Sequence, residues 1–205
     1  MAEATTVDFW FDPGCPFTWR TSRWLDDVAQ RRGLRIDWRL MSLAILNEGK
    51  DIPEPYRTMN ALGRSAGLVF QAVRDEYGPQ ALARLYTEYG RRRHDAGADL
   101  GPQLVREALA AAGLPEELVS AGDDDSRLPA LAASHAAGQD RVGQESGSPI
   151  TAIGSGPGFF GPVVVPVPEG DDALRLFDAV ALLAQVPAFS ELKRSRAPLP
   201  PVPGR

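Results

Sequence analysis

The stretch TTVDFWFDPGCPFT, residues 5–18, decides the fold class of this chain. Its first part, residues 5–12, is apolar, aromatic and β-branched and ends in an Asp-Pro-Gly turn, which predicts a buried strand. Residues 15–32 change to helical spacing and are followed by Gly33, a typical helix-terminating residue. Residues 34–41 alternate between apolar and charged side chains, which predicts a second strand. Strand, helix and strand in direct succession indicate a βαβ unit with parallel strands.

The remainder of the chain predicts that helices interrupt this α/β unit. Residues 53–143 contain several segments with helical spacing and no convincing strand. Residues 149–153 and 159–165 then predict a β-hairpin, 171–184 an amphipathic helix and 187–193 a short helix. We therefore expect one discontinuous α/β domain, formed by residues 1–52 and 144–196. Residues 53–143 are expected to form an all-helical insertion, and residues 197–205 a Pro-rich, disordered tail.

The composition excludes several classes of protein. The 205 residues are 43% hydrophobic and 24% charged, which is ordinary for a globular domain with its own core. The net charge of −5 argues against a nucleic-acid partner, because phosphate backbones are bound by clustered Lys and Arg. No run of about 18 apolar residues is present to span a membrane, and residues 1–7 lack the features of an export signal. We expect a cytoplasmic protein that binds neither nucleic acid nor membranes.

The candidate metal ligands are too scattered to predict a metal site. The single cysteine excludes internal disulfides and zinc sites built mainly from Cys. The two histidines, His94 and His135, are about forty residues apart and form no i, i+4 ligand pair. The acidic run at 123–125 is more typical of a helix N-cap than of a cation site. We therefore expect no metal, and we interpret His135 as a packed helix residue.

Cys15 differs in kind from these residues because of its position. It directly follows the first strand and its turn, and it lies at the first turn of the expected helix. A thiolate there faces unpaired backbone N–H groups and the positive end of the helix dipole, and both favour the charged form. The adjacent Pro16 costs little, because a first-turn N–H has no partner within the helix. A structural cysteine would more naturally lie mid-strand, so the position predicts a reactive thiol with a lowered pKa.

The same residues resemble the beginning of DsbA-like thioredoxin-fold oxidoreductases, and among them the actinobacterial mycothiol-dependent nitroreductases. The matching fragments are, in chain order, VDFWFDP at 7–13, Cys15-Pro16, Trp19, MSLAILNE at 41–48, GSP at 147–149, FFGPV at 159–163 and ELKR at 191–194. The resemblance implies a thioredoxin-like fold with an inserted all-helical domain, and Cys15 as the nucleophile. It also implies no tightly bound cofactor: mycothiol or a similar small thiol is the cosubstrate, and a nitroaromatic or other hydrophobic electrophile is the substrate.

One position departs from this resemblance. Oxidoreductases of this kind typically carry Cys-Pro-x-Cys, whereas this chain reads Cys15, Pro16, Phe17, Thr18. Without the second cysteine no internal disulfide can form, which leaves monothiol chemistry through a mixed disulfide with a small thiol. Thr18, one helical turn on, can donate its hydroxyl to the Cys15 thiolate. Two alternatives stay open: a non-catalytic thiol- or ligand-binding scaffold, and a relative of the kappa-type glutathione transferases and isomerases, which carry Ser at the nucleophile position.

The resemblance also implies where the thiol substrate binds. Pro149 matches the family's cis-proline, and the backbone of Ser148 would pair with the substrate beside the reactive sulfur. Further candidates for the substrate pocket are Pro16, Phe17, Trp19, Asn47 and His94. Core packing is the alternative for the two aromatic residues, and a turn or helix cap is the alternative for the asparagine. A homodimer is left open.

Overall fold

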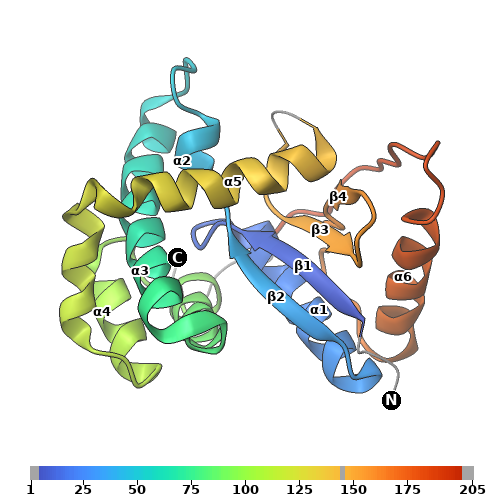
Figure 1. Ribbon diagram of the computed structural model, residues 1–205, viewed down its shortest axis with the longest axis horizontal. Coiled ribbons are helices and arrows are strands. Elements are labelled where there is room, and N and C mark those ends of the chain that lie inside the picture. Colours follow the sequence, from blue (N-terminus) through green and yellow to red (C-terminus); the bar gives the residue numbers. More distant parts are fainter. Residues whose placement is uncertain (1–4, 144–145, 200–205) are drawn as a thin grey trace.

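The computed structural model describes residues 5–143 and 146–199, and these form a mixed sheet packed between helices (Figure 1). The strands follow the order β2-β1-β3-β4, with the bounds Thr6–Phe11 for β1, Arg35–Leu40 for β2, Ile150–Ile153 for β3 and Gly158–Phe160 for β4. β1 and β2 are parallel, with Phe9 opposite Trp38, whereas β3 runs antiparallel to both β1 and β4. The predicted α/β class is confirmed.

β1, helix α1 (Pro16–Arg32) and β2 form the predicted βαβ unit. α1 begins directly after Cys15 and is followed by Gly33, whose left-handed φ of 65° lets the N–H of Leu34 donate to the Ala29 carbonyl at 3.0 Å. Trp24, on the inner side of α1, is fully buried in the main core. The turn between β1 and α1 therefore joins two well-packed elements, which fix its position.

The segment between β2 and β3 is mostly helical, as the sequence predicts. Its elements are α2 (Leu43–Leu46), α3 (Glu54–Gly90), a π-helical turn η1 (Arg91–Asp95), α4 (Pro102–Ala111), the 3₁₀ segments η2 (Glu116–Asp123) and η3 (Asp125–Arg127), and α5 (Leu128–Val142). α3 is longer than the sequence pattern indicates, because it continues through a kink at Gly78, where φ is 81° and Pro79 follows. The bounds 53–143 of a separate domain stay a prediction. Within the described ranges, no helix combines the length and apolar composition needed to cross a bilayer.

The predicted hairpin is present, but its second strand is shorter than predicted. β3 and β4 pair antiparallel, with Ile150 opposite Phe160. β4 ends at Phe160 rather than at Val165. The reason is local: Gly161 has a left-handed φ of 99°, and Pro162 has no N–H to donate to the ladder. The chain beyond this point leaves the sheet.

The C-terminal region contains one of the two helices predicted for it. α6 (Gly170–Leu183) is the amphipathic helix expected there. The short helix predicted at 187–193 is absent, and that prediction was wrong, since these residues form turns and irregular chain. Most side chains of this stretch are exposed, so little apolar burial stabilises a helix there. Phe189 instead anchors the stretch through an edge contact with Phe159, with ring centroids 5.6 Å apart.

The predicted Pro-rich tail at 197–205 lies only partly within the described residues. Residues 197–199 are irregular, and 200–205 lie outside the described residues. Just before them, the Arg196 guanidinium lies over the rings of Phe17 and Phe160, at 5.2 and 5.8 Å from their centroids. The end of the described chain therefore passes over the beginning of α1.

One face of the sheet carries the main aromatic core. Phe9 and Phe11 of β1 contact Trp38 of β2 edge to face, and Phe11 also contacts Phe70 and stacks on Tyr86 at a centroid distance of 4.0 Å. The last two residues belong to α3. This packing holds α3 against the strand that leads into the candidate site.

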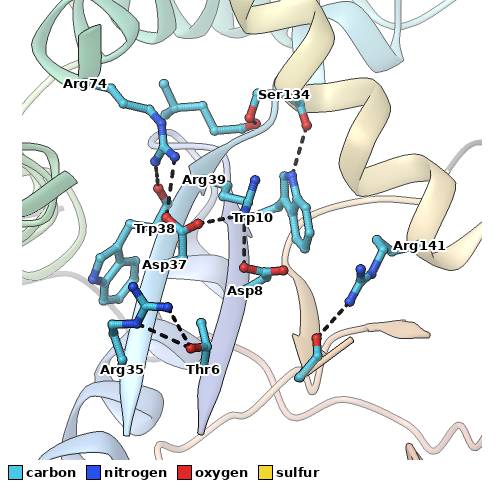
Figure 2. A network of polar contacts seen from close by, with 12 residues as sticks. Thr6, Asp8, Trp10, Arg35, Asp37, Trp38, Arg39, Arg74, Ser134 and Arg141 are labelled. Atoms are coloured by element: carbon cyan, nitrogen blue, oxygen red, sulfur yellow. Dashed lines mark hydrogen bonds and ion pairs between the residues drawn. The ribbon is translucent and has the colours of Figure 1, made fainter. Parts of the chain in front are cut away.

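The opposite face of the sheet is covered by α5 and joined by charged side chains (Figure 2). Trp10 of β1 donates its indole N–H to the Ser134 carbonyl of α5 at 2.9 Å. Next to it, Asp37 of β2 pairs with Arg39 at 2.7 Å and with Arg74 of α3 at 3.4 Å. These contacts tie α3 and α5 to the two parallel strands.

Candidate active site

Cys15 lies where β1 gives way to α1, as predicted. It is the N-cap residue of α1, with extended φ and ψ of −83° and 116°, and its N–H donates to the Asp12 carbonyl at 3.1 Å. Pro16 occupies the first helical position, where a missing N–H removes no hydrogen bond. The cysteine is only 7% exposed. The sulfur therefore lies at the positive end of a helix but is largely shielded from water.

The cis-proline segment reaches Cys15 because β3 pairs with β1. Their antiparallel register carries Ser148, just ahead of β3, to the turn that follows β1. There the Ser148 Oγ accepts the Asp12 N–H at 3.1 Å, and the Ser148 carbonyl oxygen lies 3.8 Å from Cys15 Sγ. The Ser148–Pro149 bond is cis, which confirms the prediction for this bond.

Thr18 lies beside the sulfur, on the first turn of α1. Its side chain is fully buried, and its hydroxyl is within hydrogen-bond contact of the Ser148 Oγ. The Thr18 hydroxyl and the backbone N–H groups of Thr18 and Phe17 are also hydrogen-bond donors that lower the pKa of the Cys15 sulfur. A sulfur that accepts these three donors is better stabilised as a thiolate than as a thiol.

The pKa of Cys15 is nevertheless raised rather than lowered. Burial is the largest cause, and the nearby Asp12 carboxylate raises the pKa further, whereas the hydrogen bonds from Thr18 and Phe17 lower it. The lowered pKa predicted from the helix N-terminus is therefore wrong in sign, because the loss of water around the thiolate outweighs the donors. The resting group at neutral pH is the thiol, which must lose its proton before it can act as a nucleophile.

Asp12 is a site residue that the sequence analysis missed. Asp12 is only 4% exposed, and its carboxylate accepts the Gly14 N–H at 2.8 Å and the Leu43 N–H at 2.7 Å. Burial raises the pKa of Asp12 to about 6 in spite of these two hydrogen bonds. An acid at the end of a buried strand, directly ahead of a Pro-Gly turn, was the available signal. The carboxylate holds the turn before Cys15 and the start of α2 together.

His94 and Trp19 connect the helical segment to the turn before Cys15. The His94 Nε2 donates to the Pro13 carbonyl at 2.9 Å, and burial lowers the pKa of His94 to about 4, so the ring is neutral at pH 7. Trp19 stacks on this ring with centroids 6.1 Å apart and donates its indole N–H to Asp95 at 2.9 Å. Trp19 is only 2% exposed. The structure therefore places Trp19 in the core rather than in an open pocket, and His94 behind the turn.

Pro16 and Phe17 are the two predicted pocket residues that stay partly exposed next to the sulfur. Phe17 follows Cys15 by two residues, and one face of its ring is covered by the Arg196 guanidinium. An aromatic ring under a cation retains apolar surface at its edge. Pro16 and Phe17 are therefore the predicted pocket residues adjacent to Cys15 in the sequence that keep exposed surface.

Asn47 lies away from the sulfur, at the C-terminal end of α2. It is the C-cap residue of this helix and lines an open cavity of about 500 Å³ together with Asp51 and Arg57. The residues that line this cavity do not include Cys15. The geometry thus favours the alternative of a helix cap for Asn47 over a place in the pocket above the sulfur.

A family model described as Rv2466c-like, mycothiol-dependent nitroreductase Rv2466c, matches residues 14–194. The chain belongs to this family. A relative from Mycobacterium tuberculosis, the uncharacterized protein Rv2286c, is 33% identical over 196 residues, which cover 95% of this chain and 84% of the relative.

Solved structures similar to this member of the Rv2466c-like family share its fold. The probable DsbA oxidoreductase SCO1869 from Streptomyces coelicolor has a TM-score of 0.57 at 17% identity, covering 94% of each chain. The cytosolic disulfide reductase DsbM from Pseudomonas aeruginosa has a TM-score of 0.52 at 21% identity, covering 87% of this chain and 99% of that one. The fold is therefore DsbA-like and thioredoxin-like, with a helical insertion between β2 and β3 (Figure 1).

Membership of the Rv2466c-like family identifies the chain as a thiol oxidoreductase related to mycothiol-dependent enzymes. Cys15 is its only cysteine, so the second thiol of a Cys-Pro-x-Cys motif is missing and Thr18 fills that position. The chemistry open to this member differs accordingly from that of a dithiol enzyme, since no internal disulfide can form.

Proposed function

We propose that this protein is a monothiol oxidoreductase in which Cys15 carries mycothiol, or a similar small thiol, as a mixed disulfide. The observation that supports this most strongly is the placement of the lone Cys15 sulfur 3.8 Å from the Ser148 carbonyl, beside the cis bond to Pro149. The backbone at this bond offers an edge on which an extended thiol substrate can lie. Family membership supports mycothiol as the thiol.

The reaction proposed is the transfer of mycothiol from a mixed disulfide. The Cys15 thiolate attacks the mycothiol sulfur of a substrate R–S–S–mycothiol, forms the Cys15–mycothiol disulfide and releases R–S⁻, which takes up a proton. A second mycothiol thiolate attacks the mycothiol sulfur of this intermediate, forms mycothiol disulfide and releases the Cys15 thiolate. The sum is R–S–S–mycothiol plus one mycothiol giving R–SH plus mycothiol disulfide: the R sulfur is reduced to a thiol, the incoming mycothiol sulfur is oxidised to the disulfide, and the incoming thiol supplies the proton of R–SH. Each step exchanges one S–S bond for another.

Hydrophobic electrophiles are proposed as further acceptors. For a nitroaromatic compound, two mycothiol molecules supply two electrons and two protons, which gives the nitroso compound, water and mycothiol disulfide. The family description supports this class, and the partly exposed Pro16 and Phe17 offer an apolar surface next to Cys15. We place the reaction in the cytoplasm, where small thiols are kept reduced.

Mass spectrometry of the intact protein tests the mixed disulfide. We expect incubation with mycothiol disulfide to add one mycothiol to the protein, with the adduct mapped to Cys15, and added mycothiol to remove it. Cys15→Ser is the matched control and should gain no adduct. Turnover is then followed as mycothiol-dependent reduction of a mycothiol mixed disulfide. A protein that binds mycothiol disulfide without forming the adduct would instead be a non-catalytic binding scaffold.

A further inference from the structure

Two buried hydroxyl groups, those of Thr18 and Ser148, meet next to Cys15, and the reaction proposed above gives a step to neither of them. Thr18 on α1 and Ser148 ahead of β3 are 130 positions apart in the sequence, yet their side-chain oxygens are in hydrogen-bond contact. Thr18 is fully buried and Ser148 is 6% exposed. Whereas Thr18 can donate directly to the sulfur, the proposed function uses Ser148 only through its main chain. The Ser148 hydroxyl therefore lacks a role in the proposed reaction.

The number of protons available fixes the direction of the hydrogen bonds when Cys15 is ionised. A hydroxyl has one proton to donate and two lone pairs with which to accept. If Thr18 donates to the thiolate, the proton between the two hydroxyls must come from Ser148. The Ser148 Oγ in turn accepts a hydrogen bond from the Asp12 N–H at 3.1 Å, a group that can only donate. Three donors then follow one another from the backbone to the sulfur.

The thiol form reverses part of this chain. The Cys15 S–H can donate to the Ser148 carbonyl oxygen at 3.8 Å, so the sulfur no longer requires the Thr18 proton. Thr18 is then free to donate to the Ser148 Oγ. Ser148 thus supports both protonation states of Cys15. Its carbonyl accepts from the thiol, and its hydroxyl supports the thiolate by way of Thr18.

We propose that the Ser148 hydroxyl is a positioning group that acts through Thr18 and turns the Thr18 proton toward the sulfur when Cys15 ionises. This inference rests on the proposed function and deepens it, because it assigns the support of the reacting thiolate to a side chain that does not touch it. The Thr18 hydroxyl is the donor that lowers the pKa of Cys15, whereas the Ser148 hydroxyl orients Thr18. Hydrogen bonds in such a buried chain strengthen one another.

The ionisable groups around the sulfur do not provide this support. The Asp12 carboxylate disfavours the thiolate, since like charges repel. Tyr86 of α3 has its pKa raised by burial and stays neutral, and the pKa of His94 is lowered to about 4, so it carries no positive charge at pH 7. Besides the backbone N–H groups of α1, the hydroxyl chain is therefore the favourable influence on the thiolate.

A double-mutant cycle read by thiol alkylation tests the inference. The rate of reaction with iodoacetamide is measured against pH for the wild type, Ser148→Ala, Thr18→Val and the double variant. The midpoint of each profile reports the Cys15 pKa independently of access to the sulfur. We expect Ser148→Ala to raise the midpoint by about one unit, a tenfold smaller thiolate fraction below the midpoint. In the Thr18→Val background the same substitution should leave the midpoint unchanged.

Thr21→Val is the matched control. Thr21 is also a fully buried threonine of α1, but its single hydroxyl proton is shared between the Pro162 carbonyl at 2.8 Å and the Phe17 carbonyl at 3.1 Å. Its loss should leave the Cys15 midpoint at the wild-type value. If circular dichroism shows that Ser148→Ala does not fold, the alkylation midpoint of Ser148→Gly is measured instead, and the same rise is expected.

Two outcomes would overturn the inference. One is an unchanged midpoint in Ser148→Ala, and the other is an equal shift with and without the Thr18 hydroxyl, since Ser148 would then act by another route. Iodoacetamide is used without mycothiol, so these outcomes are independent of the adduct experiment. Failure of the mycothiol adduct would refute the proposed function while the hydroxyl cycle still gives its own answer.

Discussion

The ring of Trp19 lies directly on the backbone of Gly90, so closely that any side chain at position 90 would collide with it. Gly90 is the last residue of α3, and the π-helical turn that carries His94 and Asp95 begins at the next position. The absence of a Cβ thus allows α3 to approach α1. It also brings His94 to the carbonyl of Pro13, ahead of the reactive cysteine.

Gly90→Ala should destabilise the protein, because the added methyl group must displace the Trp19 ring in a close-packed core. We expect the free energy of unfolding to fall by about 1–3 kcal/mol, the usual cost of overpacking. Urea unfolding followed by tryptophan fluorescence measures it. Gly63→Ala in the same helix is the control, since a Cβ there meets nothing within 4 Å; it should be neutral or stabilising by up to about 1 kcal/mol. Equal losses in both variants would contradict the packing argument.

The pH dependence of Cys15 alkylation should reflect burial. Because burial raises the pKa of Cys15, the rate of reaction with iodoacetamide should still be rising above pH 8.5, about the ordinary midpoint of a cysteine. The same protein unfolded in urea provides the reference and should show a midpoint at about that value. A folded-state midpoint below that of the unfolded chain would restore the prediction from the helix N-terminus and refute the dominance of burial.

Asp12 should make the protein less stable as the pH rises. Its pKa is raised from 3.8 to about 6 in the folded state, so its contribution to stability is fully present below pH 4 and is lost as the pH rises through 6. The loss amounts to about 3 kcal/mol. Asp12→Asn cannot ionise, so its free energy of unfolding should gain about this amount relative to the wild type between pH 4 and pH 7. Urea unfolding at both values measures the difference, and a constant difference would show that Asp12 has its ordinary pKa.

Local sequence patterns predicted the elements that carry the site. The strand, the turn and the helix around Cys15 are recognisable because alternation and helical spacing are properties of neighbouring residues. They placed the sulfur at the beginning of α1, where it lies in the structure. The cis bond before Pro149 came from the family resemblance instead, since few X-Pro bonds are cis and spacing alone does not reveal them.

Contacts between distant residues set the properties that local patterns missed. Asp12 accepts a hydrogen bond from Leu43, 31 positions further along, and Cys15 contacts Ser148 across 133 positions. The sign of the Cys15 pKa shift follows from the balance between helix donors and loss of water. The sequence shows the donors, because they belong to the first turn of a helix, but it does not show how much protein covers the sulfur. The sequence likewise leaves Trp19 between pocket and core, because its burial depends on the close approach of its ring to the distant Gly90.

Thr18→Cys should restore an internal disulfide. Thr18 lies three positions after Cys15 on the first turn of α1, and its hydroxyl lowers the pKa of that sulfur, so a sulfur at position 18 lies within reach of the nucleophile. Under mild oxidation the variant should lose two hydrogen atoms by mass spectrometry and show no free thiol. The wild type, with one cysteine, should show only mixed disulfides.

Thr21→Cys is the control that distinguishes the placement of positions 15 and 18 on the first turn of α1 from the mere presence of a second thiol. Thr21 is buried on the same helix but bonds to the Phe17 and Pro162 carbonyls, a turn further from the sulfur. This variant should keep both thiols free of an internal bond under the same oxidant. Two persistent free thiols in Thr18→Cys as well would mean that the start of α1 no longer presents the two positions to each other. The site would then have lost the geometry of a dithiol oxidoreductase together with its second cysteine, which favours the binding scaffold over the monothiol enzyme.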